Sequence, residues 1–371
     1  MKKTKMKTKN EILEESFGFF KRIPKIDIHR HIEGSVRPET IYELLLKEEK
    51  GIFFKSLKES MVVDGTEKNL MDFLGKLGTK FMKKVTKGKD EIVRFTFETF
   101  EDAFFDNVIY LEARICPIPH LRENLDEKDV ISAAVEGFQL AKNKFGIEGG
   151  IIVSFKRDDP KEVNEKLLKV SLDFYEKGEI LGFDLSGNEI SFPNEMFKDF
   201  LKKIPDNLVI HAGEARGAES VLSALELEAK RIGHGIKVVE SEDAVKKARD
   251  SGVLFEVNIT SNLHTKSVLD IMEHPVKQFD NLELKFLLCT DDPVTSDIDL
   301  SNEYKLFTKI YGFDLYNAKN CLLKMNKNSI EHLFCERKTK SLISKKLDEI
   351  SEKTEKAHLI NTNPYLHQKQ I

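Results

Sequence analysis

Eight short apolar runs, spread along most of the chain, constrain its fold more than any other feature of the sequence. Each run has the length and residue types of a buried strand, and segments with helical spacing separate most of them. The predicted strands cover residues 25–29, 108–115, 149–154, 180–185, 208–211, 231–234, 253–257 and 284–290. Strand and helix alternating eight times predicts a parallel α/β barrel, the TIM (β/α)₈ fold.

An open, doubly wound sheet would show the same alternation, so periodicity alone leaves that fold open. A glycine-rich dinucleotide loop after the first strand would favour the open sheet, and the sequence has none there. The 371 residues suit one barrel of roughly 250 residues with additions. We therefore expect a single domain over residues 1–371, with its core between about 22 and 335.

Extra helices are expected after the first strand and at the C-terminal end. Residues 42–105 are too long for an ordinary connection and contain an apolar stripe, so we interpret them as a helical lid or pocket wall; a packing helix pair is the alternative. The stripe consists of Leu70, Phe73, Leu74, Leu77 and Phe81. Residues 302–347 have the pattern of several helices, whereas 351–371 lose periodicity and are expected to form a poorly ordered tail.

Composition narrows the class of protein. The net charge is −4, from 59 basic and 63 acidic residues, which gives no general signal for nucleic-acid binding. The four cysteines lie far apart without a CxxC pair, so neither a disulfide framework nor a thiolate zinc site is indicated. No apolar stretch approaches the roughly 18 residues of a membrane span. The basic segment 1–10 is followed by acidic residues instead of an apolar region, so we expect a solvated tail and a cytoplasmic protein.

Several predicted strands end in residues that can bind a metal ion. His29 and His31 lie two apart at the end of the first strand, so both project from the same face. Four more such residues close later strands: His211, His234, Asp291 and Asp292. Because all strands of a barrel end at one mouth, these groups would meet there. Imidazoles with one carboxylate suit Zn²⁺, so we predict a mononuclear site, although singly His234 could be a core histidine and Asp292 a helix cap.

These strand-end residues stand in segments that resemble those of the adenosine deaminase family of the amidohydrolase superfamily, and of its bacterial members in particular. The matching segments follow the family's order: HRHIEGSVRPETI (29–41), LEARICP (111–117), GFDLSGNE (182–189), HAGEARGAES (211–220), RIGHG (231–235), TSN (260–262), HP (274–275) and TDDP (290–293). The resemblance implies zinc-dependent hydrolytic deamination of adenosine or 2′-deoxyadenosine to the inosine product and ammonia. It also implies a small purine nucleoside as substrate, with no nucleic-acid or membrane partner; the oligomeric state stays open.

The resemblance further implies roles for residues at matching positions. The ligands of one Zn²⁺ per chain would be His29, His31, His211 and Asp291. The catalytic residues would be Glu214, which would donate a proton to purine N1, and His234 and Asp291, which would assist the zinc-bound water. The substrate-binding residues would be His31, Glu33 at the ribose 5′ end, Gly187 through its N–H to N3, and Asp292 near N7.

The chemistry of deamination is consistent with these roles. Zinc lowers the pKa of a bound water towards about 7 and so supplies a nucleophile at neutral pH. Attack at C6 places negative charge on N1, so the acid facing N1 must be protonated when it acts. Glu214 follows a predicted ligand by three residues, which can place it near the metal without binding it. Nucleic-acid deaminases carry a CxxC signature that is absent here, which disfavours that fold.

The departures from the family pattern concern the far end of the substrate. Glu33 stands where nucleoside-specific members usually have Asp, and Glu is common in adenine-deaminase relatives; Gly233 stands where adenine deaminases tend to have Asp. Cys116 and Asn258 are smaller departures, interpreted as packing changes or a retuned pocket wall. Arg216 could contact an acidic substituent, with a solvated surface arginine as the alternative.

Three alternatives therefore stay open at the level of sequence. The first is an adenine deaminase or a deaminase of a 5′-modified adenosine, such as aminofutalosine or methylthioadenosine, with the same site. The second is another amidohydrolase reaction at a binuclear site, disfavoured because the fourth strand has no bridging Lys or Glu. The third is a non-catalytic purine-binding protein, disfavoured because binding alone does not require the acid Glu214 and the histidine His234.

Overall fold

The computed structural model describes residues 18–46, 51–76 and 79–362, so the predictions for residues 1–10, Leu77 and 363–371 lie outside it. Within these ranges, eight parallel strands form one sheet in the order β1 to β8. The strands are β1 (Lys25–His31), β2 (Val108–Ile115), β3 (Glu148–Lys156), β4 (Gly182–Ser186), β5 (Leu208–Ala212), β6 (Arg231–His234), β7 (Leu254–Val257) and β8 (Lys285–Leu288). The predicted barrel is confirmed.

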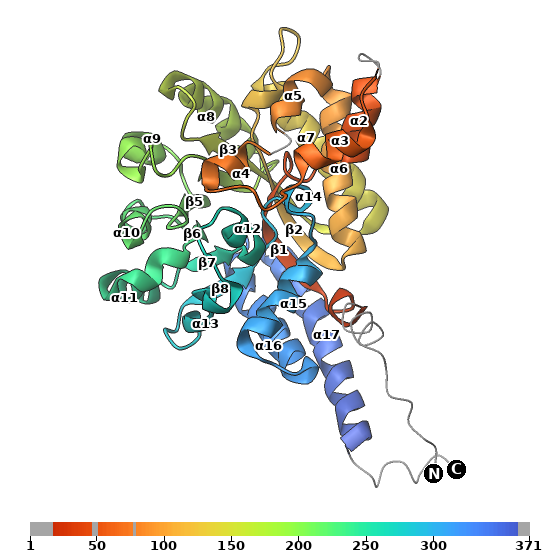
Figure 1. Cartoon of the computed structure of the whole chain (residues 1–371), viewed down its shortest axis with the longest axis vertical. Helices are drawn as coiled ribbons and strands as arrows, with labels where there is room; N and C mark the ends of the chain where they lie inside the picture. Colours follow the sequence, from red (N-terminus) through yellow and green to blue (C-terminus); the bar gives the residue numbers. More distant parts are fainter. Residues whose placement is uncertain (1–17, 47–50, 77–78, 363–371) are drawn as a thin grey trace.

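The sheet closes on itself just beyond the last strand. Asp291 N–H donates to His29 O at 2.8 Å, and His31 N–H donates to Asp291 O at 2.9 Å, which joins the end of β1 to the segment after β8. Figure 1 shows the strands at the centre of a ring of helices. This closure places Asp291 beside the two histidines of β1 through the backbone itself.

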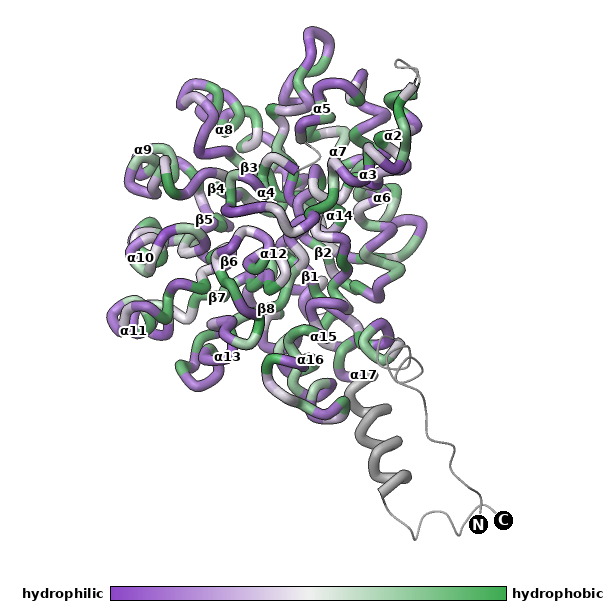
Figure 2. Tube along the Cα trace, viewed as in Figure 1, coloured by the Kyte–Doolittle hydropathy of each residue, from purple (hydrophilic) through white to green (hydrophobic). Residues whose placement is uncertain are grey.

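Most helices follow their strands as the sequence pattern predicts. The long helices between the strands begin at a polar N-cap residue, such as Asp or Ser, or directly after a proline. Several of them end at a glycine in the left-handed conformation. The helices around the barrel are α6 (Lys89–Phe105), α7 (Glu127–Phe145), α8 (Lys161–Glu176), α9 (Lys198–Leu201), α10 (Ala218–Glu226), α11 (Glu242–Ser251), α13 (Val276–Phe279), α15 (Leu300–Tyr311) and α16 (Leu315–Ser329). In Figure 2 the outer helices alternate hydrophobic and hydrophilic residues, as expected for one buried and one solvated side.

The insertion after β1 is helical, as predicted, and its apolar stripe is divided between two short helices. Its helices before α6 are α2 (Pro38–Leu46), α3 (Phe54–Met61), α4 (Leu70–Leu74) and α5 (Thr79–Val85). Asn69 begins α4 by accepting from Asp72 N–H, and Gly75 follows its last residue. Leu70 and Phe73 are buried, so this short helix presents apolar side chains to the barrel mouth.

The C-terminal helix is longer than expected. Helix α17 (Arg337–Thr362) continues well past residue 351 and projects away from the barrel in Figure 1. The sequence has no glycine or proline between Gly312 and Pro364, and such breakers are what most disfavour a helix. The apolar periodicity is lost at residue 351, where we expected a poorly ordered tail to begin, but the helix continues to Thr362. Among the residues described, no helix is both long and apolar enough to cross a membrane.

Candidate active site

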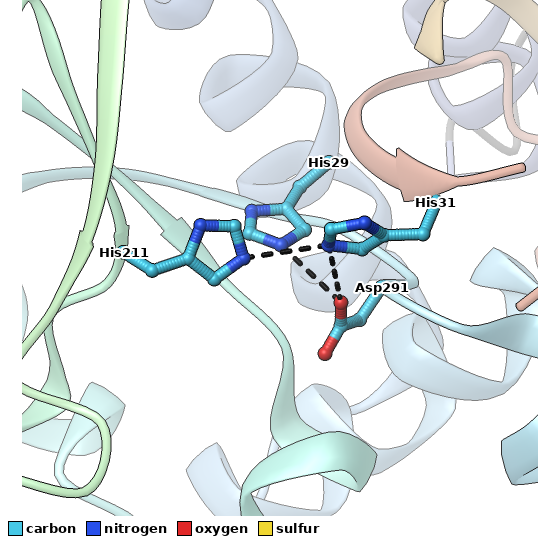
Figure 3. Close-up of side chains that lie close together, drawn as sticks. All are labelled: His29, His31, His211 and Asp291. Carbon is cyan, nitrogen blue, oxygen red and sulfur yellow. Dashed lines mark hydrogen bonds and ion pairs between the residues drawn. The ribbon is translucent and has the colours of Figure 1, made fainter. Parts of the chain in front are cut away.

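Four side chains predicted as metal ligands gather at the mouth of the barrel. His29 and His31 come from β1, His211 from β5 and Asp291 from the segment after β8, and one ligand atom from each lies within 4.8 Å of all the others. Asp291 Oδ1 is 3.3 Å from His29 Nε2 and 3.4 Å from His31 Nε2, and the two Nε2 atoms of His31 and His211 are 3.4 Å apart. Figure 3 shows all four side chains pointing into one common space.

This donor set fits a zinc ion. Tetrahedral ligands at 2.0–2.1 Å from zinc lie roughly 3.3–3.4 Å from one another, which the three shortest separations match. Within the described residues, the buried His29 Nε2 has no hydrogen-bond partner, and its 3.3 Å approach to Asp291 lacks hydrogen-bond geometry. Burial lowers the pKa of both His31 and His211, which favours the neutral imidazole that binds a metal. The cluster therefore has the geometry of a metal site, and the lowered pKa of two of its three histidines favours the metal-binding form of those rings.

Buried carboxylates hold the imidazoles from behind. Glu256 on β7 accepts from His29 Nδ1 at 2.6 Å, and Asp184 on β4 accepts from His211 Nδ1 at 2.9 Å. Arg114 on β2 lies between the two carboxylates, 2.9 Å from Glu256 and 3.3 Å from Asp184. A carboxylate on the far ring nitrogen fixes the tautomer and leaves Nε2 free for a metal. Sequence reasoning missed these partners, because only the closed barrel brings them to the histidines.

The backbone at the end of β6 and after β8 leaves little room for larger side chains beside the predicted ligands. His234 and Asp291 both adopt left-handed backbone angles, with φ of 61° and 62°. Gly233 lies against the ligands, since a Cβ there would be 3.0 Å from His29 Cε1 and 3.2 Å from the His211 ring. A larger residue before His234 would crowd the metal ligands.

Glu214 and His234 lie beside the cluster without joining it. His234 Nε2 is 3.6 Å from Glu214 Oε2 and 3.9 Å from Asp291 Oδ2. Burial, with the nearby carboxylates of Asp291 and Glu189, raises the pKa of Glu214 well above its usual range. This shift favours the protonated form of Glu214, which is the form that an acid donating to a ring nitrogen needs.

Glu189 positions the loop that carries Glu214. Its carboxylate accepts four successive backbone N–H groups, from Gly213 to Arg216, at 2.6–3.2 Å, and it also accepts from the Ser220 hydroxyl. The segment GFDLSGNE contains Glu189, but no role for this residue was predicted from the sequence. Arg216 itself forms a half-exposed pair with Glu219, which matches the surface interpretation.

Asp292 and Gly187 line the same pocket as the cluster, as predicted. Asp292 Oδ1 is buried without a hydrogen-bond partner, and burial with the charges of Asp291 and Glu33 raises its pKa well above the usual range. A protonated Asp292 can donate to an acceptor such as a purine nitrogen. Gly187 has φ 101° and lies against Asp158, so a side chain there would be both strained and crowded.

Glu33 lines the pocket, but one of its two carboxylate oxygens is already hydrogen-bonded within the protein. Its Oε1 accepts from Cys116 N–H at 2.9 Å and from His120 Nε2 at 3.1 Å. The side chain is 3% exposed and still lines the pocket, which leaves Oε2 for other contacts. Cys116 also lines the pocket, so this departure from the family pattern lies in the pocket wall.

Lys156 is an unpredicted cation in the pocket. It ends β3 opposite Ser186 of β4, and both residues line the cavity. The ammonium group of Lys156 forms no hydrogen bond or close ion pair with any described residue. The guanidinium of neighbouring Arg157, by contrast, is bound to Phe192 O, Asn194 and His211 O. Apolar side chains of α4, Leu70, Phe73 and Leu74, complete the wall, which supports the pocket-wall interpretation of the insertion.

Comparison with known proteins agrees with this geometry. The family profile described as Adenosine deaminase matches residues 24–350. The chain belongs to the adenosine deaminase family. An adenosine deaminase from Clostridium acetobutylicum is 34% identical over 333 residues, covering 88% of this chain and 97% of the relative. The chain is thus an aminohydrolase acting on C–N bonds, as the resemblance implied.

Two solved structures show the same fold. The Arabidopsis N6-mAMP deaminase has a TM-score of 0.77 and 25% identity, and the match covers 90% of this chain and 99% of that one. An amidohydrolase from Burkholderia ambifaria, solved with bound Zn, has a TM-score of 0.80 and 21% identity, covering 95% and 96%. The chain thus has the amidohydrolase TIM-barrel fold of its family, and its His/Asp cluster has the donor set of a metal site.

Proposed function

We propose that the protein deaminates adenosine and 2′-deoxyadenosine to inosine and 2′-deoxyinosine, with release of ammonia. The observation that carries this proposal is the buried Glu214, 3.6 Å from His234 and beside the proposed metal-ligand cluster, with its pKa raised by burial. An acid next to a source of nucleophilic water is what hydrolysis at a purine C6 needs. The similarity to an adenosine deaminase over 97% of that relative's length supports the same substrate.

We propose His29, His31, His211 and Asp291 as the ligands of one Zn²⁺. When bound, the ion supplies a nucleophile at neutral pH by lowering the pKa of water. A single ion is supported because, within residues 18–46, 51–76 and 79–349, this is the one group of three or more donors close enough together. Metal analysis should give about one zinc per chain, and a value near two would contradict the proposal.

The chain's own residues bind the purine and move the protons. Gly187 N–H would donate to N3 and protonated Asp292 to N7, which orients C6 towards the cluster. As water adds to C6, Glu214 gives its proton to N1, so the charge that develops on the ring is neutralised. The C6–N bond then breaks: the amino group leaves as ammonia with the proton that the attacking water gave to Asp291. The C6 hydroxyl returns a proton to Glu214 as the C6 carbonyl of the product forms. His31, Glu33 and the α4 side chains would enclose the sugar.

Deamination is tested by the ultraviolet change of purified zinc-loaded enzyme with adenosine. Glu214→Gln should lower kcat by about 10²–10⁴-fold with zinc content unchanged, because the amide cannot release a proton. The matched control is Glu219→Gln, an exposed glutamate five residues along. A Glu214→Gln enzyme with near-normal turnover would refute the assigned role, and a wild-type enzyme inactive on every adenine compound would refute the function.

A second candidate substrate is an adenosine with a modified 5′ group, or adenine itself. The observation that favours it is the pocket lining, which combines Glu33 with the ammonium of Lys156, a group that has no close partner among the described residues. The Arabidopsis neighbour acts on a nucleotide, N6-mAMP, by its description. Adenosine, adenine, AMP, N6-methyl-AMP and methylthioadenosine should therefore be compared. A much higher kcat/KM for one of the last four would make it the substrate.

We further propose that residues 1–371 form one catalytic domain and that the protein is cytoplasmic. The family match over residues 24–350 supports the first proposal. The four free thiols, Cys116, Cys289, Cys321 and Cys335, suit a reducing compartment and support the second. Fractionation of cells that produce the protein would test the location.

A further inference from the structure

The segments TSN (260–262) and HP (274–275) have no role in the mechanism so far, and both lie behind His234. Asn262, in helix α12 (Ile259–His264), places its Nδ2 atom 3.1 Å from His234 Nδ1. His274 Nε2 lies 3.2 Å from Asn262 Oδ1 on the other side of the amide. All three side chains are buried, so water does not compete for these contacts.

The direction of these hydrogen bonds follows from a backbone group. Val276 N–H, the first N–H of helix α13, donates to His274 Nδ1 at 3.1 Å, and a backbone N–H can only donate. Burial lowers the pKa of His274 to about 3, so its ring is neutral at pH 7 and carries its one proton on Nε2. Nε2 therefore donates to Asn262 Oδ1. The amide cannot be reversed, and its NH₂ end faces His234.

We propose that His274 and Asn262 form a positioning relay that holds His234 as the neutral tautomer with its proton on Nε2. Since Asn262 presents NH₂ to His234 Nδ1, that nitrogen must accept, and only a ring without a proton on Nδ1 can do so. Asn258 favours the same tautomer of His234. Its Nδ2 donates to the carbonyl of Glu256 at 3.1 Å and lies 3.4 Å from the same His234 nitrogen.

This tautomer decides what His234 can do at the reacting centre. Its Nε2–H faces the space between Glu214 and Asp291. There it donates a hydrogen bond to the attacking oxygen and cannot take that oxygen's proton. The proton lost as the C6–O bond forms passes instead to the Asp291 carboxylate, while Glu214 protonates N1. His234 is thus an orienting donor, and the relay keeps it so.

The relay is tested by ¹⁵N NMR of histidine-labelled protein, with zinc bound and after zinc removal. The two nitrogens of each tautomer have distinct shifts, and the signals of His234 are those lost in His234→Gln. We expect protonated Nε2 and unprotonated Nδ1 in the wild type. Asn262→Asp, which can only accept, should move the proton to Nδ1 or add one there. His274→Ala, which frees the amide to rotate, should give a mixture.

Kinetics give a second readout. Asn262→Asp should lower kcat by about 10–100-fold, as for other residues that orient a catalytic group, with KM changed less than about threefold. Asn326→Asp is the matched control, because Asn326 is equally buried but bonds to Ile26 N–H and Tyr304, away from His234. It should leave the His234 signals and kcat unchanged.

Two results would overturn the relay: protonated Nδ1 on wild-type His234, or an Asn262→Asp protein that keeps both the wild-type signals and kcat. If Asn262→Asp does not fold, His274→Ala decides on the same signals. Only the effect on turnover rests on the proposed deaminase function. The NMR signals need no substrate, so an enzyme inactive on all purines would refute that function and leave the tautomer result standing.

Discussion

Single residues at this site are constrained by contacts that are visible only at atomic distance. Gly34 is the clearest case, because a Cβ built on it would lie 1.7 Å from Asp292 Oδ1. The sequence shows this glycine only as part of HRHIEGS, next to Glu33. The structure shows that it makes room for the carboxylate proposed to orient the purine.

Gly34→Ala should therefore displace Asp292 and lower kcat/KM for adenosine by about 10²-fold, the usual cost of misplacing a substrate by about 1 Å. Zinc content should stay unchanged, because Gly34 contacts no proposed ligand. Gly88→Ala serves as control, since nothing lies within 4 Å of a Cβ there. Equal activity of Gly34→Ala and wild type would show that Asp292 does not need its present position.

Lys156 allows a prediction about substrate choice. Burial alone would lower its pKa, but Cys116, Asp158 and Glu33 nearby raise it, so the side chain stays charged. If the substrate carries an anionic group, Lys156→Met should lower kcat/KM for AMP by at least about tenfold and change that for adenosine less than threefold. Lys161→Met, on the first turn of α8, is the surface control. A parallel loss for both substrates would assign Lys156 to the pocket structure instead.

At the scale of elements, the sequence was most informative where strands are buried on both faces. The predicted limits of β2 and β6 match the structure, and the other six strands differ by one or two residues at one end or at both. Parallel strands within a barrel read as continuous apolar runs, which is why they could be found. The residues proposed as metal ligands could be singled out for the same reason, because each stands where such a run ends.

The residues behind the ligands could not be predicted, because their partners are distant in sequence. Asp184 and His211 are 27 residues apart, and Glu256 and His29 are 227 apart. In the sequence alone, Asp184 and Glu256 are charged residues within otherwise apolar strands, and no pattern indicates what they bind. Only the closed barrel, which turns alternate side chains inward, explains why these carboxylates are buried there.

Helices α12 and α15 are joined by a buried acid whose charge should affect stability. Glu303 on α15 accepts from Thr260 N–H and from its hydroxyl, and burial raises the pKa of Glu303 to about 7. An acid with a raised folded-state pKa stabilises the fold below its unfolded pKa, near 4.5, and that contribution is lost as the pH rises through 7.

In the wild type we expect the unfolding free energy to fall by at most about 3 kcal/mol between about pH 4.5 and 7. In Glu303→Gln this decline should therefore be smaller. Denaturant unfolding at several pH values measures it. Glu331→Gln, at an exposed position, should keep the wild-type slope. An unchanged slope in Glu303→Gln would mean that other groups cause the decline.

At the scale of the whole molecule, the metal cluster links segments from both ends of the chain. His29 and His31 lie on the first strand, His211 lies on the fifth, and Asp291 closes the barrel after the eighth. Buried charges continue below the cluster, where Arg231 pairs with Glu112 and Glu256. Such pairs need all their partners in place, so the interior of the barrel depends on correct closure.

Removing the metal should therefore destabilise the whole barrel. A ligand that binds only the folded state adds about 4 kcal/mol at a concentration 1,000 times its Kd, so dialysis against a chelator should lower Tm by at least about 5 °C. Zn²⁺ should restore Tm and Mg²⁺, which prefers oxygen ligands, should not. His211→Asn should have a low Tm that neither chelator nor zinc changes, whereas His264→Asn, a histidine outside the cluster, should respond like the wild type. If the chelator removes all zinc and Tm stays the same, the cluster serves chemistry alone and the barrel closes without it.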